Sequence, residues 1–204
     1  VKKDELDIFK KFGILKESIN YKTNENKNLL MIAIENNSKY IGNYLIENKI
    51  NVKEKDNYGL NSLMYTAKNN SVEIARLILK ESEEGLEESG KIALKNDSID
   101  VFKLLNKKGL KINSLDDDGT NYLMVASKNN SVEIAKYLLS EGINKNDKDK
   151  RGYNALVYAV NNDSYEVAKL LLEKGIKVKS EDRIMDMTKS QKMRDLLRDY
   201  GIKW

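Results

Sequence analysis

Residues 129–139 read NNSVEIAKYLL, and this stretch recurs with small changes along the chain. The serine of the stretch has four counterparts, which gives the series Ser38, Ser71, Ser98, Ser131 and Ser164. The successive spacings are 33, 27, 33 and 33 residues. Periods of this length are typical of proteins built from supersecondary units that bury their apolar faces only against neighbouring units. The repeat therefore predicts a fold made of stacked, similar units.

Each serine is followed by an amphipathic segment. Apolar residues stand one, three, seven and eight positions after it, as in the copy that begins at Ser131. This spacing puts them on one stripe of a helix. The serine oxygen can accept a hydrogen bond from an unpaired N–H of the first turn, where an acidic residue is also favourable. We therefore expect a helix after each serine, capped by the serine side chain.

A shorter helix is expected before each serine. It carries a leucine and, three positions later, a small residue that lets two antiparallel helices approach closely. These pairs are Leu30 and Ala33, Leu63 and Thr66, Leu123 and Ala126, and Leu156 and Ala159. Asn or Asp precedes each serine, and both residue types tolerate the left-handed backbone that a tight connection needs. These turn residues are Asn37, Asn70, Asp97, Asn130 and Asp163.

The end of each second helix is also marked in the sequence. Gly109, Gly142 and Gly175 stand where they can cap the helix C-terminus. An extended segment then leads to Asp-x-x-Gly turns at residues 56–59, 116–119 and 149–152. Each unit is thus expected to be a helix pair followed by a hairpin loop.

The combined pattern resembles the ankyrin-repeat family, whose consensus runs Asp-x-x-Gly-x-Thr-Pro-Leu-His, then Ala, then a second helix ending in Leu-Leu and Gly. The resemblance implies an all-α fold, an α-solenoid of stacked helix-turn-helix units with projecting hairpin loops. Five repeats are expected between two terminal units. Their ranges are 1–22 (partial repeat, an N-terminal cap formed by a second helix), 23–55, 56–82, 83–115, 116–148 and 149–181 (repeats 1 to 5), and 182–204 (C-terminal capping repeat).

The first of these units is expected to be incomplete. Leu6, Ile8, Phe9 and Phe12 fall on the second helix of a repeat whose first helix would precede Val1. We therefore expect the natural protein to extend further at its N-terminus.

Two family positions differ consistently from the consensus. Asparagine replaces threonine at Asn28, Asn61, Asn121 and Asn154, and Met31, Met64, Met124 and Val157 replace histidine. Asparagine can still cap the first helix. The polar network that threonine and histidine would share is lost, so stability should depend more on packing.

The 27-residue spacing is the second irregularity. Six residues are missing between Ser82 and Glu83, where the other units have their hairpin. Residues 80–88 contain five glutamates, which is typical of a solvated connection. We expect the missing hairpin to leave a notch in one rim of the array.

The composition argues against catalysis. The chain has no histidine and no cysteine, which excludes the commonest general base and the usual zinc ligands. A hydrolase using carboxylates would need a converging cluster, and the sequence shows none. Residues 147–152 resemble a calcium loop, but Arg151 stands at a ligand position and Tyr158 replaces the closing glutamate. We predict no enzyme activity, no catalytic residue, no cofactor and no metal site.

Charge and hydropathy narrow the class of partner. Lys plus Arg (36) nearly balance Asp plus Glu (32), and the basic stretches are short. The sequence therefore predicts no nucleic-acid partner. No apolar run is long enough for membrane insertion. Only five of the 36 basic residues are arginine, a bias expected from an AT-rich genome such as that of a low-GC bacterium.

The resemblance implies contacts with another protein, through the hairpin tips and the exposed side of the first helices. The matching positions in repeats 2, 4 and 5 are Asn57, Tyr58, Leu60, Lys68, Asn69, Asp117, Asp118, Thr120, Lys128, Asn129, Lys150, Arg151, Tyr153, Asn161 and Asn162. Arg151 and Tyr153 belong to residue types that dominate interface energetics, so we expect the strongest contacts there.

We predict a monomeric scaffold that binds a partner protein through its concave face and hairpin tips. The alternative is the recognition module of a larger protein or secreted effector whose other activity lies outside this sequence. A cytoplasmic location is slightly favoured. Secretion or a periplasmic location stays open, because a signal could have been removed upstream of Val1.

Overall fold

The computed structural model describes residues 19–178 and 183–203. Regular structure in this part of the chain is helical, and the one β-type contact is an isolated bridge between Lys22 and Asn28. The chain divides into two compact units, Val1–Leu110 and Lys111–Trp204. The helix predicted around Leu6 to Phe12 lies outside the described residues. The repeat boundaries themselves stay a prediction.

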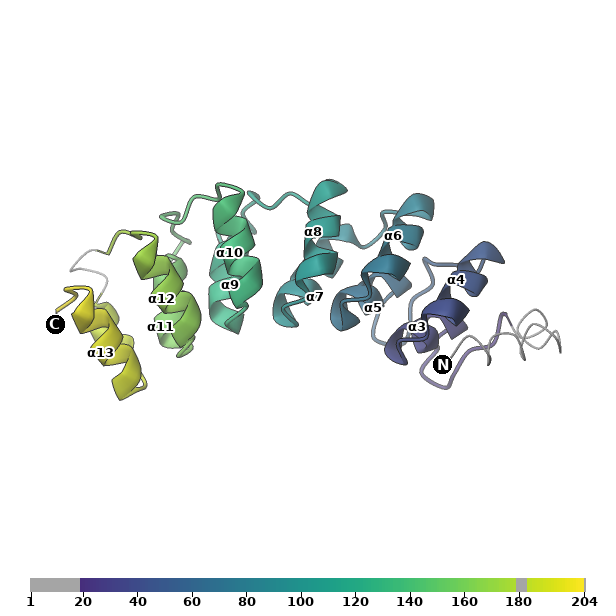
Figure 1. The fold of residues 1–204 in the computed structure, drawn as a ribbon, viewed down its shortest axis with the longest axis horizontal. Helices are drawn as coiled ribbons and strands as arrows, with labels where there is room; N and C mark the ends of the chain where they lie inside the picture. The colour runs from purple at the N-terminus through teal and green to yellow at the C-terminus, as the bar shows by residue number, and fades with distance from the viewer. Residues whose placement is uncertain (1–18, 179–182, 204) are drawn as a thin grey trace. The chain divides into compact units, whose positions relative to one another are not determined.

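Three helix pairs form the first unit. They are α3 (Leu29–Glu35) with α4 (Lys39–Glu47), α5 (Ser62–Asn69) with α6 (Val72–Glu81), and α7 (Leu86–Lys95) with α8 (Ile99–Lys107). The first helices α3, α5 and α7 pack against one another in order, and so do α4, α6 and α8 (Figure 1). The unit is therefore two layers of helices.

The second unit follows the same plan. Its helices are α9 (Tyr122–Asn129), α10 (Val132–Ser140), α11 (Ala155–Asn161), α12 (Tyr165–Glu173), the 3₁₀-helix η2 (Ile184–Met187) and α13 (Gln191–Asp199). Helix α11 packs against α9 and η2. Helix α12 packs between α10 and α13 (Figure 1). The closing pair η2 and α13 covers one end of the unit.

The predicted core positions are buried. The four leucines of the first helices and the small residues three positions later are at most 4% exposed. In the second helices, Ile74, Ile134, Leu138 and Leu171 of the predicted stripe are buried, whereas Val132 and Leu139 are half-buried. The helical period of the apolar residues thus identified the centre of the core, and the edges of the stripe are partly exposed.

The turns between paired helices are left-handed at the predicted residues. Asn37, Asn70, Asp97, Asn130 and Asp163 all have φ between 48° and 56°. The serine that follows each of them donates its N–H to a carbonyl five residues earlier, as Ser38 does to Ala33 at 2.7 Å. This is the Schellman arrangement that ends a helix.

The predicted serine caps are wrong. None of the five serine side chains makes a capping hydrogen bond to the second helix. Their ψ angles lie between 71° and 81°, whereas Ser190 has a ψ of 152° and does cap α13. Because the Schellman turn fixes the serine backbone, its hydroxyl is not directed at the N–H groups of the next helix.

The predicted asparagine caps are correct. Asn28, Asn61, Asn121 and Asn154 accept hydrogen bonds through Oδ1 from the first turn of α3, α5, α9 and α11. Their Nδ2 groups also bond to the loop that follows the paired second helix, as Asn154 does to the Lys177 carbonyl at 3.1 Å. In repeats 1, 2, 4 and 5, one buried amide therefore joins the start of the repeat to the loop after its second helix, and packing is not the only stabilising contribution.

The short spacing is accommodated by a direct link. Residues 82–85 connect α6 to α7 without a hairpin, and α7 begins three positions earlier than α9 does in the 33-residue register. Gly85 has a φ of +84°, and a Cβ there would lie 2.8 Å from Asn61 Nδ2. The link therefore requires glycine, both for its backbone and for its close approach to α5.

Candidate protein-binding site

The three hairpin tips share one rigid frame. In each tip Oδ1 of an aspartate accepts hydrogen bonds from the N–H groups two and four positions later, at distances of 2.7–3.0 Å. The aspartates are Asp56, Asp116 and Asp149, and the glycine three positions after each has positive φ. The frame fixes the direction of the side chains at the predicted contact positions.

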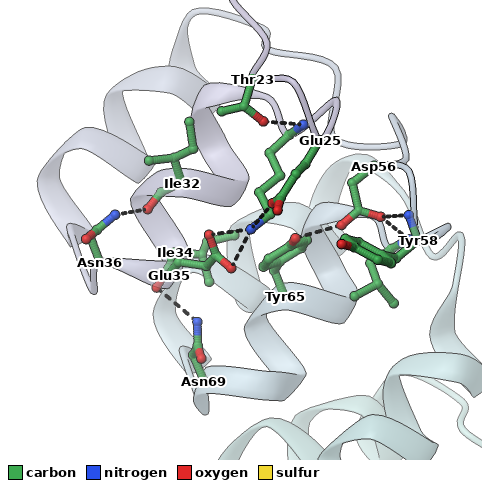
Figure 2. Close-up of polar contacts among 12 residues, drawn as sticks. Thr23, Glu25, Ile32, Ile34, Glu35, Asn36, Asp56, Tyr58, Tyr65 and Asn69 are labelled. Atoms are coloured by element: carbon green, nitrogen blue, oxygen red, sulfur yellow. Dashed lines mark hydrogen bonds and ion pairs between the residues drawn. The ribbon is translucent and has the colours of Figure 1, made fainter.

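In the first unit the tip is braced by a tyrosine. The hydroxyl of Tyr65 donates to Asp56 Oδ2 at 2.7 Å, as Figure 2 shows. Tyr65 is 2% exposed, and this burial together with the Asp56 carboxylate raises the pKa of its phenol. The phenol therefore acts as a hydrogen-bond donor to the tip.

A lysine is enclosed beside the same tyrosine. The Nζ atom of Lys27 lies 2.9 Å from Glu25 and 3.1 Å from Glu35, and 5.8 Å from the centre of the Tyr65 ring. Hydrogen bonds to the two glutamates raise the pKa of Lys27 above its usual value. On α5, the helix that carries Tyr65, Lys68 Nζ is 5.9 Å from the same ring. The charge of Lys27 is therefore balanced by Glu25 and Glu35.

The predicted residues of the first unit divide into two groups. The amide of Asn69 donates to the Ile34 carbonyl at 3.2 Å, and Asn57 bonds to the preceding tip. These two asparagines are structural. By contrast, Tyr58 is 72% exposed and Lys68 is exposed, while Leu60 is half-buried. Among the five predicted contact residues of this unit, the exposed side chains that make no structural hydrogen bond are therefore Tyr58 and Lys68.

Repeat 4 contributes mainly exposed polar residues to the second unit. Asp117, Asp118, Lys128 and Asn129 are exposed, and Thr120 is half-buried. The Asn129 amide donates to its own helix at the Val125 carbonyl, 3.1 Å away. The charged residues of repeat 4 are thus accessible, but they do not form a site by themselves.

In repeat 5 the arginine folds back over its own tip. Nε and Nη2 of Arg151 donate to Asp149 Oδ2 at 3.1 and 3.0 Å, and Nη2 also lies 2.6 Å from the Tyr158 hydroxyl. Its guanidinium carbon is 5.0 Å from the Tyr153 ring centre and 5.6 Å from that of Tyr158. The guanidinium is therefore oriented before any partner arrives.

The carboxylate that holds this arginine is buried. The Asp149 side chain is 1% exposed, and burial alone would raise its pKa. Hydrogen bonds from the Tyr153 N–H, the Tyr158 hydroxyl and Arg151 outweigh burial, so the pKa of Asp149 lies below its usual value. Asp149 is thus ionised at neutral pH and anchors Arg151.

A shallow depression of about 140 Å³ lies beside this arginine. Its lining residues are Lys128, Arg151, Tyr153, Val157, Tyr158, Asn161 and Asn162. Five of the seven were predicted as contact residues, and they come from α9, the tip of repeat 5 and the end of α11. None of the seven is acidic, so the depression is suited to an electronegative group.

Several hydrogen-bond donors around the depression are open. Within the described part of the chain, neither Lys128 Nζ nor Arg151 Nη1 has a hydrogen-bond or ion-pair partner, and the Asn161 amide is likewise unused. In the same residues no group of three or more His, Cys, Asp or Glu is placed to hold a metal ion. No described helix is both long and apolar enough to cross a membrane. The open donors of the depression can therefore bind a ligand group by hydrogen bonds and by charge.

The sequence prediction missed two lining residues, Val157 and Tyr158. Tyr158 follows Asp149 by nine positions, as Tyr65 follows Asp56. This shared Asp-to-Tyr spacing was the available signal, and it could have identified the bracing tyrosines. No comparable signal pointed to the enclosure of Lys27, because no other repeat carries glutamate at the positions that correspond to Glu25 and Glu35.

Comparisons with known proteins agree with this architecture. A family profile described as ankyrin repeats (3 copies) matches residues 1–87 and 91–182. The solved ankyrin repeat domain of human ASB11 is similar over 87% of this chain and 85% of its own, with a TM-score of 0.73 and 19% identity. That of Bcl-3, a member of the IκB protein family, is similar over 94% and 92%, with a TM-score of 0.67 and 19% identity. No curated protein matches the chain. The likeness to the solved structures shows the fold, and the profile covers most of the sequence, so the chain belongs to the ankyrin-repeat family.

Proposed function

We propose that this protein is a non-enzymatic scaffold that binds a partner protein, with the depression at repeat 5 as its principal contact. Ankyrin repeats are generally protein–protein interaction modules, which supports the general class. The convergence of Lys128, Arg151 and Tyr153 on one depression supports the place. The same site would serve if the chain is the recognition module of a longer protein.

The chemistry of the depression favours an acidic side chain of the partner. Arg151 is held by Asp149 with Nη1 unused, and Lys128 supplies a second cation with no carboxylate among the lining residues. A guanidinium fixed in advance loses little conformational freedom on binding. The methylene groups of an acidic side chain that contacts both cations can also pack against the Tyr153 ring, and tyrosine is enriched in binding hot spots.

The test is affinity capture from an extract of the source organism. The wild-type chain is compared with Lys128→Ala, which removes an unpaired charge without disturbing the tip, and with Arg151→Ala combined with Tyr153→Ala. The matched control is Lys169→Ala with Tyr200→Ala, because both residues are exposed elsewhere in the same unit. All chains are first checked for unchanged helicity.

The proposal predicts one protein that the wild type and the control retain and that both site variants bind at least tenfold more weakly. Its binding should also weaken with added salt, since the contact is between charges. Equal capture by all four chains would contradict the assignment of the depression. Turnover of a small molecule by a chain that captures no protein would contradict the scaffold function.

A further inference from the structure

Consecutive tips are joined by hydrogen bonds in a fixed register. In the first unit Asn57 donates its N–H to the Glu25 carbonyl at 2.9 Å and its Nδ2 to the Asn24 carbonyl at 3.1 Å. Residues 24 and 25 stand one and two positions after Thr23, which occupies the aspartate position of repeat 1. One asparagine of the following tip therefore satisfies two carbonyls of the preceding tip.

The second unit repeats this register. The Lys150 N–H donates to the Asp118 carbonyl at 2.9 Å. Lys150 is one position after its tip aspartate, as Asn57 is, and Asp118 is two positions after its own, as Glu25 is. Each tip thus has an accepting edge that is covered by the next tip along the chain.

The tip of repeat 2 has no following tip. Its accepting edge consists of the Asn57 and Tyr58 carbonyls, but residues 82–85 lead directly into α7. Among the described residues, no hydrogen bond to either carbonyl is formed. The frame around Asp56 nevertheless holds the tip in the same conformation as the others, with Tyr58 Nα donating at 2.8 Å. An ordered acceptor edge is left open beside a highly exposed tyrosine.

We propose that this open edge is a docking site for a turn of a partner protein, which replaces the missing tip. The turn donates a backbone N–H to the Tyr58 carbonyl and a side-chain N–H to the Asn57 carbonyl, and it covers the Tyr58 ring. Unpaired backbone groups at an ordered edge are a ready template for such pairing.

The charges near the edge specify the turn further. Residues 83–88, where the missing tip would begin, contain four glutamates and no basic residue. The Glu84 carbonyl accepts from Asn61 Nδ2 at 2.9 Å, and the Glu84 carboxylate lies 3.8 Å from Lys55. An acidic turn would be repelled there. The partner turn therefore carries asparagine or a basic residue at the donating position, as Asn57 and Lys150 do in this chain. The site does not involve the depression at repeat 5 and is tested separately.

The probe is a cyclic peptide with the sequence of residues 55–61, KDNYGLN, closed by a disulfide between added terminal cysteines. It is titrated into ¹³C,¹⁵N-labelled protein, and the carbonyl resonances of Asn57 and Tyr58 are followed. A saturable shift of both resonances is expected. N-methylation of the peptide at its Asn57 position removes the donated N–H and should weaken binding at least tenfold.

The matched control is N-methylation at the Lys55 position of the peptide, whose N–H forms no hydrogen bond in the folded tip. This control peptide should bind as well as the unmodified one. Absence of a saturable shift, or equal binding by both methylated peptides, overturns the proposal.

A second variant covers the edge from within the protein. Residues 83–88 are replaced by the sequence of residues 143–154, which restores the 33-residue spacing and supplies a tip with its own aspartate and glycine. Probe binding to this variant should fall at least tenfold. Undiminished binding to a variant with native helicity overturns the proposal, and if the variant does not fold, the methylated peptides decide.

Discussion

The tips of repeats 2 and 5 share a frame but use it differently. Both have an aspartate whose Oδ2 accepts from a tyrosine hydroxyl nine positions later, at 2.7 Å for Tyr65 and 2.8 Å for Tyr158. Two positions after the aspartate, repeat 2 has Tyr58, which projects into solvent, and repeat 5 has Arg151, which folds back over the tip. The same tip frame thus carries an exposed aromatic side chain in repeat 2 and an oriented cation in repeat 5.

The surroundings of the two bracing tyrosines explain the difference. Lys27 and Lys68 already lie within 6 Å of the Tyr65 ring. In the 33-residue register the corresponding positions around Tyr158 are Thr120 and Asn161, which carry no charge. The face of Tyr158 is therefore free for Arg151, whereas a cation at position 58 would meet two others. A contact position is defined by its neighbouring repeats as well as by its own tip.

The largest effect should come from removing the aspartate of the better-braced tip. Asp149→Ala leaves two tip N–H groups, the Tyr158 hydroxyl and Arg151 without their acceptor, and should lower the free energy of unfolding by about 2–3 kcal/mol. Asp116→Ala removes only the two backbone contacts of an exposed aspartate and should cost about 1 kcal/mol. Urea unfolding measures both. Equal losses would show that the bracing side chains add nothing to the frame.

The link beside the repeat 2 tip is the next test. Gly85→Ala places a Cβ 2.8 Å from Asn61 Nδ2 in a backbone with φ of +84°, and should cost about 2 kcal/mol from strain and a displaced cap. Gly109 also has positive φ, but a Cβ there meets nothing within 4 Å. Gly109→Ala should therefore cost about 1 kcal/mol, for the backbone alone. If the two losses in urea unfolding are the same, residues 82–85 are not held against α5.

Much of this molecule was predictable from local patterns. The helix pairs, their buried stripe and the left-handed turn residues follow from periodicity and from the backbone preferences of Asn and Asp. The serine caps were wrong because one residue ends the first helix and begins the second, and the first role fixes its ψ. The conformation of Arg151 was not predictable from its own tip, since repeat 2 has the same aspartate and tyrosine pair, and the two tips differ in the lysines that lie near the tyrosine ring.

Exchanging side chains between the tips of repeats 2 and 5 tests whether the neighbouring lysines explain the difference. Arg151→Tyr with Tyr153→Leu gives repeat 5 the residues of repeat 2 and removes the partner of the buried Asp149, so the melting temperature should fall. Tyr58→Arg with Leu60→Tyr gives repeat 2 the residues of repeat 5. This reverse exchange should raise the melting temperature little or not at all, because Lys27 and Lys68 already lie within 6 Å of the Tyr65 ring and compete with the new guanidinium for it. A clear increase would contradict the explanation from neighbouring charges.

The smallest effect concerns pH and isolates the charge of Asp149. Because its pKa is lower in the folded protein than its usual value near 3.8, ionised Asp149 stabilises the fold above that pH. This contribution is lost as the pH falls below about 4 towards the folded pKa. The difference in unfolding free energy between the wild type and Asp149→Asn should therefore be constant from pH 7 to 5 and shrink below pH 4. Tyr158→Phe removes one donor that keeps the folded pKa low, so in that background the loss should be smaller and should be complete at a higher pH. A difference that stays constant down to pH 3 would mean that Asp149 supports the repeat 5 tip by shape and hydrogen bonding alone, as the uncharged groups of the repeat 1 tip do.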